Sequence, residues 1–355
     1  MQTLNSVSDM RSFSREVRAH GRSLALVPTM GALHEGHFSL IHQAKRQCDV
    51  VVVSIFVNPR QFNSPEDLER YPRNLEKDLE LLQPFRIDAV FAPSAGEMYP
   101  EGFTTSVDPG DIAQPLEGSS RPGHFRGVAT VVLKLLNIIR PNVAYFGQKD
   151  FQQALVVRRL VEDLDLDVRF VISPIVRDAD GMALSSRNAL LSAAERRAAL
   201  VLSQSLKRAE QLAQSGVSDS DRLKAEMGKL FAEEPLAQLE YTAMVDPVHL
   251  EPVRHVTPGS LALVAARVGK VRLIDNLIFG PPGASPQMLL QLALTAHPVV
   301  DTDALIPGFQ AEAVRRTIEN CRECAAFNSI MCRRRNSFRS TSRRCTPTSM
   351  RRWGR

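Results

Sequence analysis

The sequence predicts an α/β protein: a Rossmann-like doubly wound parallel sheet followed by a smaller C-terminal α+β domain. The run DVVVVSIF at 49–56 is almost wholly β-branched and apolar, which is typical of a strand buried on both faces of a parallel sheet. Strand-like and helix-like segments alternate with short connections between residues 24 and 172. After Arg187 the composition changes to Ala- and Leu-rich helical segments. A chain of 355 residues also exceeds one average domain.

The first domain is expected to contain five short strands separated by helices. An amphipathic helix within residues 1–22 precedes the first strand. The strands are predicted at 24–27, 49–56, 87–91, 143–146 and 168–172. The helices between them are predicted at 38–46, 72–82, 128–139 and 151–163. Residues 104–107 are expected to add an edge strand.

The region after Arg187 is predicted to form two helices and three strands. The helices are expected at 193–214 and 219–232, and the strands at 240–245, 261–268 and 271–277. Gly269 and Lys270 alone separate the last two strands, which indicates a β-hairpin. We therefore divide the chain into a nucleotide-binding domain at 1–180, a small α+β domain at 181–280 that would act as a lid, and an extension at 281–355.

The extension differs from the rest of the chain in its charge. From Arg315 onward there are twelve arginines and two acidic residues, whereas residues 1–314 carry 32 basic and 37 acidic side chains. The net charge of +5 therefore comes from the tail. PPGASP at 281–286 indicates a linker, 287–296 a weak helix, and we expect the Arg-rich end to be disordered. Cys321 and Cys324 form a single C-x-x-C without the second pair of ligands that a zinc site needs.

Composition also restricts the cellular context. No apolar run approaches the ~20 residues of a membrane span, and residues 1–22 lack the apolar core of a signal peptide. We expect a cytoplasmic protein without membrane contact. The mildly acidic body argues against nucleic-acid binding by bulk charge, which leaves only the tail as a candidate for such contacts.

The stretch VPTMGALHEGHF at 27–38 is the strongest candidate for chemistry. It joins a strand to a helix through Gly31 and Gly36, and it places His34 and His37 three residues apart on the first helical turn. A helix N-terminus offers unpaired N–H groups and a positive dipole end, which suits an anion. The pattern predicts a phosphate site whose histidines donate protons, and a nucleoside triphosphate is the natural ligand. A solvent-exposed helix turn is the alternative.

Two further loops are expected at the same edge of the sheet. VNPRQF at 57–62 and GQKD at 147–150 each follow a predicted strand, and the carboxyl ends of parallel strands meet at one edge. LSSRN at 184–188 supplies two hydroxyls and an arginine that can stabilise a departing polyphosphate. Taken alone, LSSRN is more typical of a helix N-cap series leading to Asn188.

Together these motifs resemble the pantothenate synthetase (pantoate–β-alanine ligase) family of the nucleotidylyltransferase superfamily. The resemblance runs from about residue 4 to about residue 279. The matching segments are VPTMGALHEGH at 27–37, VVVSIFVNPRQF at 51–62, RYPR at 70–73, EGSSRPGHFRGV at 117–128, FGQKDFQQ at 146–153, ALSSRN at 183–188 and RLIDN at 272–276. The extension after Pro281 has no counterpart in the resemblance.

The resemblance implies an ATP-dependent ligase of coenzyme A biosynthesis. Such enzymes couple (R)-pantoate to ATP, giving pantoyl adenylate and pyrophosphate, and β-alanine then attacks the adenylate to release pantothenate and AMP. The family uses ATP with Mg²⁺ and is usually a homodimer. Another adenylate-forming or nucleotidylyl-transferring enzyme of the superfamily stays open as an alternative. So does a protein of another class that binds nucleic acid through the Arg-rich tail.

The resemblance also implies roles for individual residues. His37 would be the proton donor, with His34, Lys149 and Arg187 completing the catalytic set. Pantoate would contact Gln61 and Gln153, and β-alanine would contact Gln61. The implied ATP surface comprises Met30, Gly31, Ala32, Leu33, His34, Glu35, Gly36, His37, Gly147, Gln148, Lys149, Asp150, Val176, Leu184, Ser185, Ser186 and Arg187.

Three further polar residues receive no role from the sequence. Asp78 is a conceivable Mg²⁺ ligand, but an aspartate on a helix surface is the simpler interpretation, and the metal ligands stay unassigned. His124 and Arg126 lie in the RPGHFRG segment without a partner pattern that would define their contacts.

Overall fold

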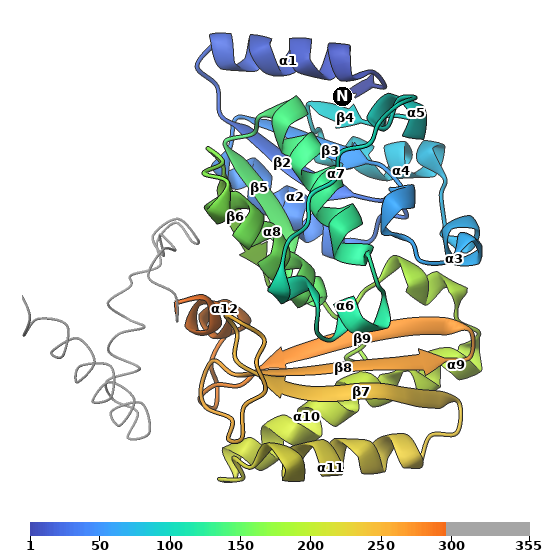
Figure 1. Ribbon diagram of the computed structural model, residues 1–355, viewed down its shortest axis with the longest axis vertical. Helices are drawn as coiled ribbons and strands as arrows, with labels where there is room; N and C mark the ends of the chain where they lie inside the picture. The colour runs from blue at the N-terminus through green and yellow to red at the C-terminus, as the bar shows by residue number, and fades with distance from the viewer. Residues whose placement is uncertain (296–355) are drawn as a thin grey trace, which may run out of the picture. The chain divides into compact units, whose positions relative to one another are not determined.

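The structure, a computed structural model, describes residues 1–295 and contains two β-sheets (Figure 1). The larger sheet has six parallel strands in the order β1-β4-β3-β2-β5-β6. Its strands are β1 (Gln2–Leu4), β2 (Leu24–Thr29), β3 (Val50–Ile55), β4 (Ala89–Phe91), β5 (Val143–Gly147) and β6 (Arg169–Ser173). The direction of strand addition reverses between β2 and β5, which makes this position the topological switch point. The predicted fold class is confirmed.

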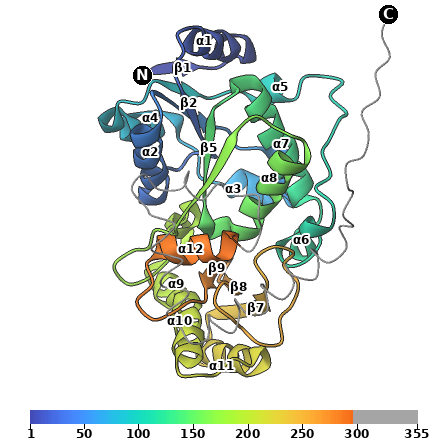
Figure 2. The same ribbon diagram turned by 90° about the vertical axis from the view of Figure 1, so that its left-hand side faces the viewer.

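Helices cover both faces of the parallel sheet, with α2 and α4 on one side and α7 and α8 on the other (Figure 2). The α-helices of this region are α1 (Val7–Ala19), α2 (Glu35–Gln47), α3 (Pro65–Arg70), α4 (Leu75–Leu82), α5 (Ala95–Met98), α6 (Glu117–Ser120), α7 (His124–Ile139) and α8 (Phe151–Asp163). Short 3₁₀ turns are η1 (Pro59–Gln61), η2 (Gln83–Phe85), η3 (Asp111–Ala113) and η4 (Gln148–Asp150). No helix within residues 1–295 has the length and apolarity needed to cross a membrane.

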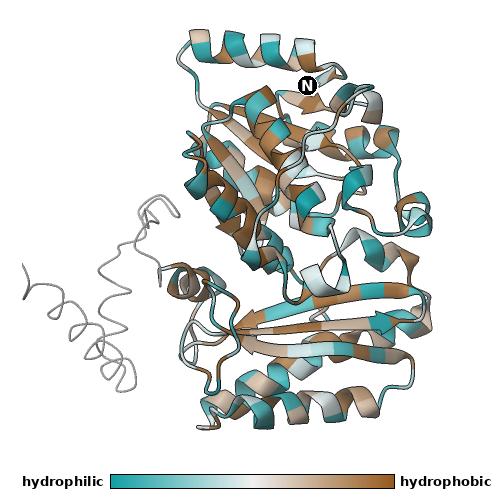
Figure 3. Cartoon of the chain, viewed as in Figure 1, coloured by the Kyte–Doolittle hydropathy of each residue, from teal (hydrophilic) through white to brown (hydrophobic). Residues whose placement is uncertain are grey.

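The core of this region follows from the apolar strands and one strongly apolar helix. Residues 24–27 of β2 and 50–53 of β3 are almost completely buried, as the β-branched runs require. Most residues of helix α7 are buried: the helix packs against α8, and its apolar side chains share a core cluster with residues of β2, β3 and β4. Figure 3 shows the hydrophobic colouring of the sheet region. The strands β2, β3 and β5 are therefore held in a well-packed core. The loops that follow their carboxyl ends carry the candidate site.

The second sheet is antiparallel, in the order β7-β8-β9, with α10 and α11 on its side away from the larger sheet (Figure 1). Its strands are β7 (Ala237–Val245), β8 (Leu261–Val268) and β9 (Val271–Ile278), and its helices are α9 (Ala193–Ala198), α10 (Leu200–Gln214) and α11 (Ser220–Ala232). Val268 pairs with Val271 across the Gly269–Lys270 turn, so the predicted hairpin is present.

The last described helix, α12 (Pro286–Leu294), contacts both β6 and β9. Leu290, Ala293 and Leu294 are at most 3% exposed and join an apolar cluster with Phe151 from α8 and Ile278 from β9. This segment of the extension is therefore part of the folded body. The division at residues 180 and 280 stays a prediction, because β9 and α12 both contact elements of the larger sheet's region.

Several elements differ from those expected from sequence. Residues 104–107 form no strand, and the Val107 N–H instead donates to the Thr130 hydroxyl of α7 at 2.9 Å. The predicted helix at 193–214 is two helices, α9 and α10, that meet at Ala199. The sequence also missed β1, whose three residues are too few for a periodicity, and α3. The expectations for the Arg-rich end and for Cys321 and Cys324 lie outside the described residues.

Candidate active site

The loop after β2 is held by a buried carboxylate from α4. Asp78, 3% exposed, accepts hydrogen bonds from the N–H groups of Ala32 and Leu33, both at 2.9 Å. Gly31 has φ +78°, and a Cβ built on it would lie 2.7 Å from Asp78 Oδ2. A glycine is therefore needed at this position, both for the backbone conformation and for the approach of Asp78. Each carboxylate oxygen of Asp78 thus accepts a hydrogen bond from a backbone N–H group of the loop. We conclude that Asp78 supports the loop.

His34 and His37 cap the first turn of α2 reciprocally. His34 is the N-cap residue, and its Nδ1 lies 3.2 Å from the Gly36 N–H. His37 Nδ1 lies 3.3 Å from the His34 N–H. Each Nδ1 must accept a hydrogen bond here, so in the uncharged ring the proton is on Nε2. The capping geometry thus leaves two Nε2–H donors at the N-terminus of a helix.

The two imidazoles are uncharged at neutral pH. Burial, reinforced by Lys149, lowers the pKa of His34 to about 4. Burial, reinforced by the neighbouring His34 ring, lowers the pKa of His37 to about 3. The ring centroids are 4.1 Å apart. The pair can therefore offer hydrogen bonds to a polyanion without requiring two adjacent positive charges.

Gln61 is fixed by η1, the turn that follows β3. Asn58 donates to Gln61 Oε1 at 3.0 Å and to the Gly127 carbonyl at 3.1 Å, and Tyr99 donates to Asn58 Oδ1 at 2.8 Å. A Cβ on Gly127 would lie 2.8 Å from Gln61 Cα and only 2.2 Å from the Arg60 carbonyl oxygen. Gly127 therefore allows α7 to pack against η1 and to set the position of Gln61.

Lys149 and Asp150 follow β5 in the turn η4. Lys149 Nζ lies 3.3 Å from Asp150 Oδ1. Burial alone would raise the pKa of Asp150, but Lys149 and the more distant Arg187 hold this pKa below its ordinary value. The site thus contains an ionised carboxylate beside a lysine.

The segment at 174–187, which we call the strap, lines the cavity with residues 174–176 and 184–187. Ser185 caps the 3₁₀ turn η5 (Ser186–Leu190) by accepting from the Arg187 N–H at 3.3 Å. Ser186 Oγ donates to the Ala32 carbonyl at 3.0 Å, which ties the strap to the loop after β2. Arg187 pairs with Asp67 of α3 at 3.3 Å and lies over the ring of Tyr71 at 5.5 Å.

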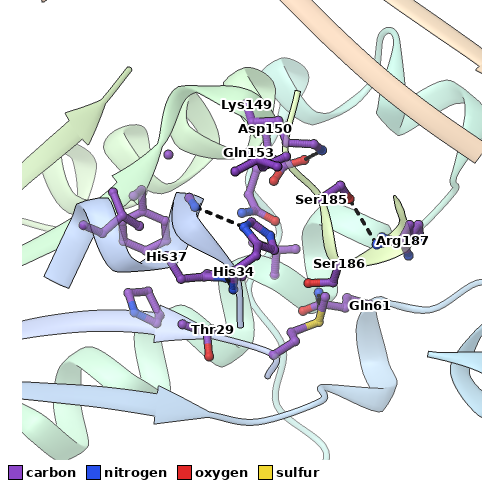
Figure 4. Close-up of a pocket in the computed structure, with 18 of the residues that line it drawn as sticks. Thr29, His34, His37, Gln61, Lys149, Asp150, Gln153, Ser185, Ser186 and Arg187 are labelled. Carbon is purple, nitrogen blue, oxygen red and sulfur yellow. Dashed lines mark hydrogen bonds and ion pairs between the residues drawn. The ribbon is translucent and has the colours of Figure 1, made fainter. Parts of the chain in front are cut away.

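One cavity collects most of the residues expected from sequence (Figure 4). Fourteen of them line it: Met30, His34, Gly36, His37, Gln61, Gly147, Lys149, Asp150, Gln153, Val176, Leu184, Ser185, Ser186 and Arg187. Five do not line it: Gly31, Ala32, Leu33, Glu35 and Gln148. Of these, Gly31, Ala32 and Leu33 form the backbone that Asp78 holds. The three loops that follow β2, β3 and β5 thus meet as expected from the sheet topology.

The cavity also has lining residues that the sequence did not single out. Polar groups come from Thr29, Asn58 and Tyr71. Val131 and Leu135 of α7 contribute apolar side chains to the lining. Thr29, Asn58 and Tyr71 lie in the motif segments at 27–38, 57–62 and 70–73, although no role was given to them individually. Val131 and Leu135 lie outside those segments, and nothing local distinguishes them from core residues.

An adjoining cavity explains His124. It shares Gln61, Lys149 and Gln153 with the first cavity and adds Arg121 and His124. His124 Nδ1 lies 2.8 Å and an Arg121 nitrogen 3.2 Å from the Gln61 carbonyl, and another Arg121 nitrogen lies 3.2 Å from His124 Nε2. Burial and Arg121 lower the pKa of His124 to about 4. His124 and Arg121 thus hold the backbone of Gln61.

Arg126, the other unassigned residue of this segment, has a different environment. Its Nε donates to Ser106 Oγ at 2.8 Å in an exposed contact. Arg126 lines neither of the two cavities described above.

A capped helix N-terminus, a lysine and a serine–arginine strap thus surround the switch point of a doubly wound sheet. This arrangement defines an α/β enzyme of the nucleotide-binding class. A family model described as Pantoate-beta-alanine ligase matches residues 2–278. The chain belongs to this family, whose members are ligases that form a carbon–nitrogen bond.

Individual relatives agree over nearly their whole length. The pantothenate synthetase of Heliobacterium modesticaldum is 51% identical over 278 residues, which is 78% of this chain and 99% of the relative. A crystal structure of pantothenate synthetase from Thermus thermophilus aligns with a TM-score of 0.75 at 43% identity, covering 79% of this chain and all of that chain. The Francisella tularensis pantoate-beta-alanine ligase, complexed with beta-gamma ATP and beta-alanine, aligns with a TM-score of 0.67 at 36% identity, covering 81% and 99%.

Proposed function

We propose that the chain joins (R)-pantoate and β-alanine in an ATP-dependent reaction that proceeds through pantoyl adenylate. The observation that carries this proposal is one cavity lined by two histidines, a lysine and an arginine together with two glutamine side chains and several apolar residues. His34, His37 and Lys149 suit the phosphates. Gln61 and Gln153 suit a carboxylate and hydroxyls without adding charge.

In the first step, the pantoate carboxylate attacks the α-phosphorus of ATP. A C–O–P bond forms, and the bond between the α-phosphorus and the oxygen bridging to the β-phosphate breaks, so pyrophosphate leaves. The attacking group is already an anion and needs no base, so the protein's task is to hold two anions together and to stabilise the leaving charge. We assign that task to Lys149, Arg187 and the Nε2–H groups of the histidines. The resemblance implies His37 as the proton donor, and its uncharged ring would act here by donating a hydrogen bond from Nε2 to a phosphate oxygen. Ser185 and Ser186 would add hydroxyl donors.

In the second step, the uncharged amine of β-alanine attacks the acyl carbon. A C–N bond forms, the bond between the acyl carbon and the phosphate oxygen breaks, AMP leaves with the electron pair, and the nitrogen releases one proton to water. The adjoining cavity offers a place for β-alanine, because Arg121 is a cation beside Gln61. Burial lowers the pKa of Arg121 to about 10, so the guanidinium is still charged at neutral pH. Gln61 lines both cavities, which supports its assignment to both pantoate and β-alanine. The complex of the Francisella relative with β-alanine supports this substrate.

The resemblance implies Mg²⁺ as the partner of ATP. Within residues 1–295 no group of three or more His, Cys, Asp or Glu side chains is arranged to hold a metal ion. Asp78 is engaged by backbone N–H groups, and Asp150 and Asp67 are paired with Lys149 and Arg187. These residues do not form a dedicated metal site. Mg²⁺ would instead arrive bound to the phosphates of ATP, as it commonly does in nucleotide sites.

We also propose that the protein is a homodimer and is located in the cytoplasm. Light scattering after size exclusion tests the dimer directly. The two alternatives are not favoured: family membership and the amide pair argue against a different acceptor, and the Arg-rich tail on which the nucleic-acid alternative depends lies outside the described residues.

The proposal is tested by pantoate-dependent exchange of labelled pyrophosphate into ATP in the absence of β-alanine. Wild type should exchange, and both His37→Ala and Lys149→Ala should lose the exchange while keeping the fold. A folded wild type that exchanges with another carboxylic acid but not with pantoate would overturn the substrate assignment.

A further inference from the structure

Two adjacent polar residues of the small sheet are buried without belonging to the cavity that collects the phosphate-binding groups. Asp275 and Asn276 of β9 are 4% and 2% exposed. Adjacent strand residues point to opposite faces, so a buried polar pair of this kind needs partners on both sides. Those partners come from the two segments that carry Lys149 and the strap.

Asn276 is bound to the turn η4. Its amide Nδ2 donates to the carbonyls of Gln148 at 3.1 Å and Lys149 at 2.9 Å, and its Oδ1 accepts from Gln148 Nε2 at 3.1 Å. These contacts use both N–H donors of the amide and part of its acceptor capacity. Although Asn276 also lines the adjoining cavity, its donors are not available to a ligand there. Asn276 therefore fixes the backbone from which the Lys149 side chain projects.

Asp275 is bound to the base of the strap. It accepts two hydrogen bonds from Arg177, at 2.6 and 2.9 Å, in a bidentate ion pair. Arg177 also donates to the Gly181 carbonyl at 3.1 Å and pairs with Ala183 in an isolated β-bridge. The chain continues from Ala183 directly into Leu184 and the Ser185–Arg187 turn. A bidentate arginine–carboxylate pair fixes orientation as well as distance, so Asp275 determines where the strap begins.

We propose that Asp275 and Asn276 are positioning residues that connect the small sheet to the phosphate chemistry: Asn276 sets the position of Lys149, and Asp275 sets the position of the strap that ends in Arg187. The inference rests on the proposed function. It assigns to the small sheet a part in adenylation itself, since two groups that act on the phosphates are fixed from one strand. Misplacing such groups by about 1 Å can reduce a rate by roughly 100-fold.

The decisive experiment is a double-mutant cycle in the pyrophosphate exchange assay. Asn276→Ala is expected to lower the kcat of exchange by roughly 10- to 100-fold while changing the KM for ATP by less than about threefold. If Asn276 acts through Lys149, adding Asn276→Ala to Lys149→Met should change the remaining rate by no more than about threefold. If the double variant instead loses rate by the product of the two single losses, the role of Asn276 is overturned. An Asn276→Ala protein that exchanges within twofold of wild type would overturn it as well. If exchange by the Lys149→Met protein is too slow to detect, the test depends on Asn276→Ala alone, which must lower kcat while leaving the KM for ATP nearly unchanged.

Asp275→Asn tests the second half of the proposal. The variant keeps the size of the side chain but weakens the bidentate pair with Arg177. Its kcat should fall, and a cycle with Arg187→Gln should again show losses that do not multiply. Losses that multiply, or a kcat unchanged from wild type, would overturn the role of Asp275.

Arg267→Gln is the matched control for both positions. It removes an ion pair to Glu240 inside the same small sheet without touching η4 or the strap, and it should leave exchange unchanged. A loss with Arg267→Gln equal to that with Asn276→Ala would show that any weakening of the sheet has the same effect, and would overturn the inference. Circular dichroism and thermal unfolding verify that each variant is folded. A wild type without pantoate-dependent exchange would instead reject the proposed function, and the two failures are thereby distinguished.

Discussion

The two sides of the candidate cavity are held in different ways. The loop after β2 is fixed by buried hydrogen bonds, with Asp78 at 3% exposure and the histidine cap closing on itself. The end of the strap is fixed by the ion pair of Arg187 with Asp67, whose side chain is 44% exposed. Buried hydrogen bonds are costly to leave unmade, whereas partly exposed ion pairs contribute little. The difference indicates that one side is preformed and that a polyanion can rearrange the other.

The largest effect on stability and activity is expected from a substitution that adds a methyl group to the loop after β2. Gly31→Ala would place Cβ 2.7 Å from Asp78 Oδ2 on a backbone with φ +78°. We expect a loss of about 2–4 kcal/mol in the free energy of unfolding, from backbone strain together with a displaced buried carboxylate, and a loss of most exchange activity. Urea unfolding and the exchange assay measure the two quantities.

A matched glycine on the strap provides the control for this substitution. Gly181 has φ +92°, but the nearest atom to its added Cβ is Ser203 Oγ at 3.7 Å. Gly181→Ala should therefore cost only about 1 kcal/mol of backbone strain. Equal losses at both glycines would contradict the contrast between the two sides.

The next effect concerns the acceptor that holds the loop. Asp78→Asn replaces one carboxylate oxygen by an NH₂ group, which then faces a backbone N–H of Ala32 or Leu33. Leaving a buried donor unsatisfied costs about 1–3 kcal/mol, so the melting temperature and the exchange rate should both fall. A variant with wild-type stability would show that Asp78 does not fix the loop.

The histidine cap predicts how stability depends on pH. His37 has a folded pKa of about 3 and an ordinary value of 6.5, so below pH 6.5 the unfolded chain binds a proton that the folded chain excludes. Stability therefore falls as the pH is lowered from 6.5, by at most about 1.4 kcal/mol per pH unit for this one group. His37→Asn can keep the cap acceptor but cannot be protonated. As the pH falls from 6.5 to 4, the wild type should therefore lose more unfolding free energy than the variant does. A constant difference would refute the prediction.

The smallest effect is expected on the strap. Asp67→Asn removes the partner of Arg187 at a partly exposed site, which is worth less than about 1 kcal/mol. Because ATP phosphates would compete with Asp67 for Arg187, the variant should keep its stability and show a KM for ATP that is unchanged or lowered by about two- to threefold. An increase in KM would mean that Asp67 holds Arg187 in its working position.

The sequence predicted the strands well where burial leaves a continuous apolar pattern. The run at 49–56 became β3 at Val50–Ile55, and 151–163 became α8 without change. The loops of the cavity were also predictable, because the topology of a parallel sheet places the carboxyl ends of its strands together. Their individual roles stay predictions until the exchange assay tests them.

The contacts that determine the site could not be predicted, because they join residues far apart in the chain. Asn276 meets Lys149 across 127 positions, and His124 meets Gln61 across 63. No local pattern encodes either pair. Asp78 resembled a surface residue for the same reason: its partners lie in a loop 45 and 46 positions earlier.

The packing of α12 has a practical consequence for anyone who shortens this chain. The family match ends at residue 278, which suggests removing everything after it. Such a cut would uncover the apolar cluster that Leu290, Ala293 and Leu294 cover, including Phe151 at the start of α8. Newly exposed apolar surface favours aggregation. A truncated protein intended to stay in solution at high concentration should therefore retain the chain through Thr295.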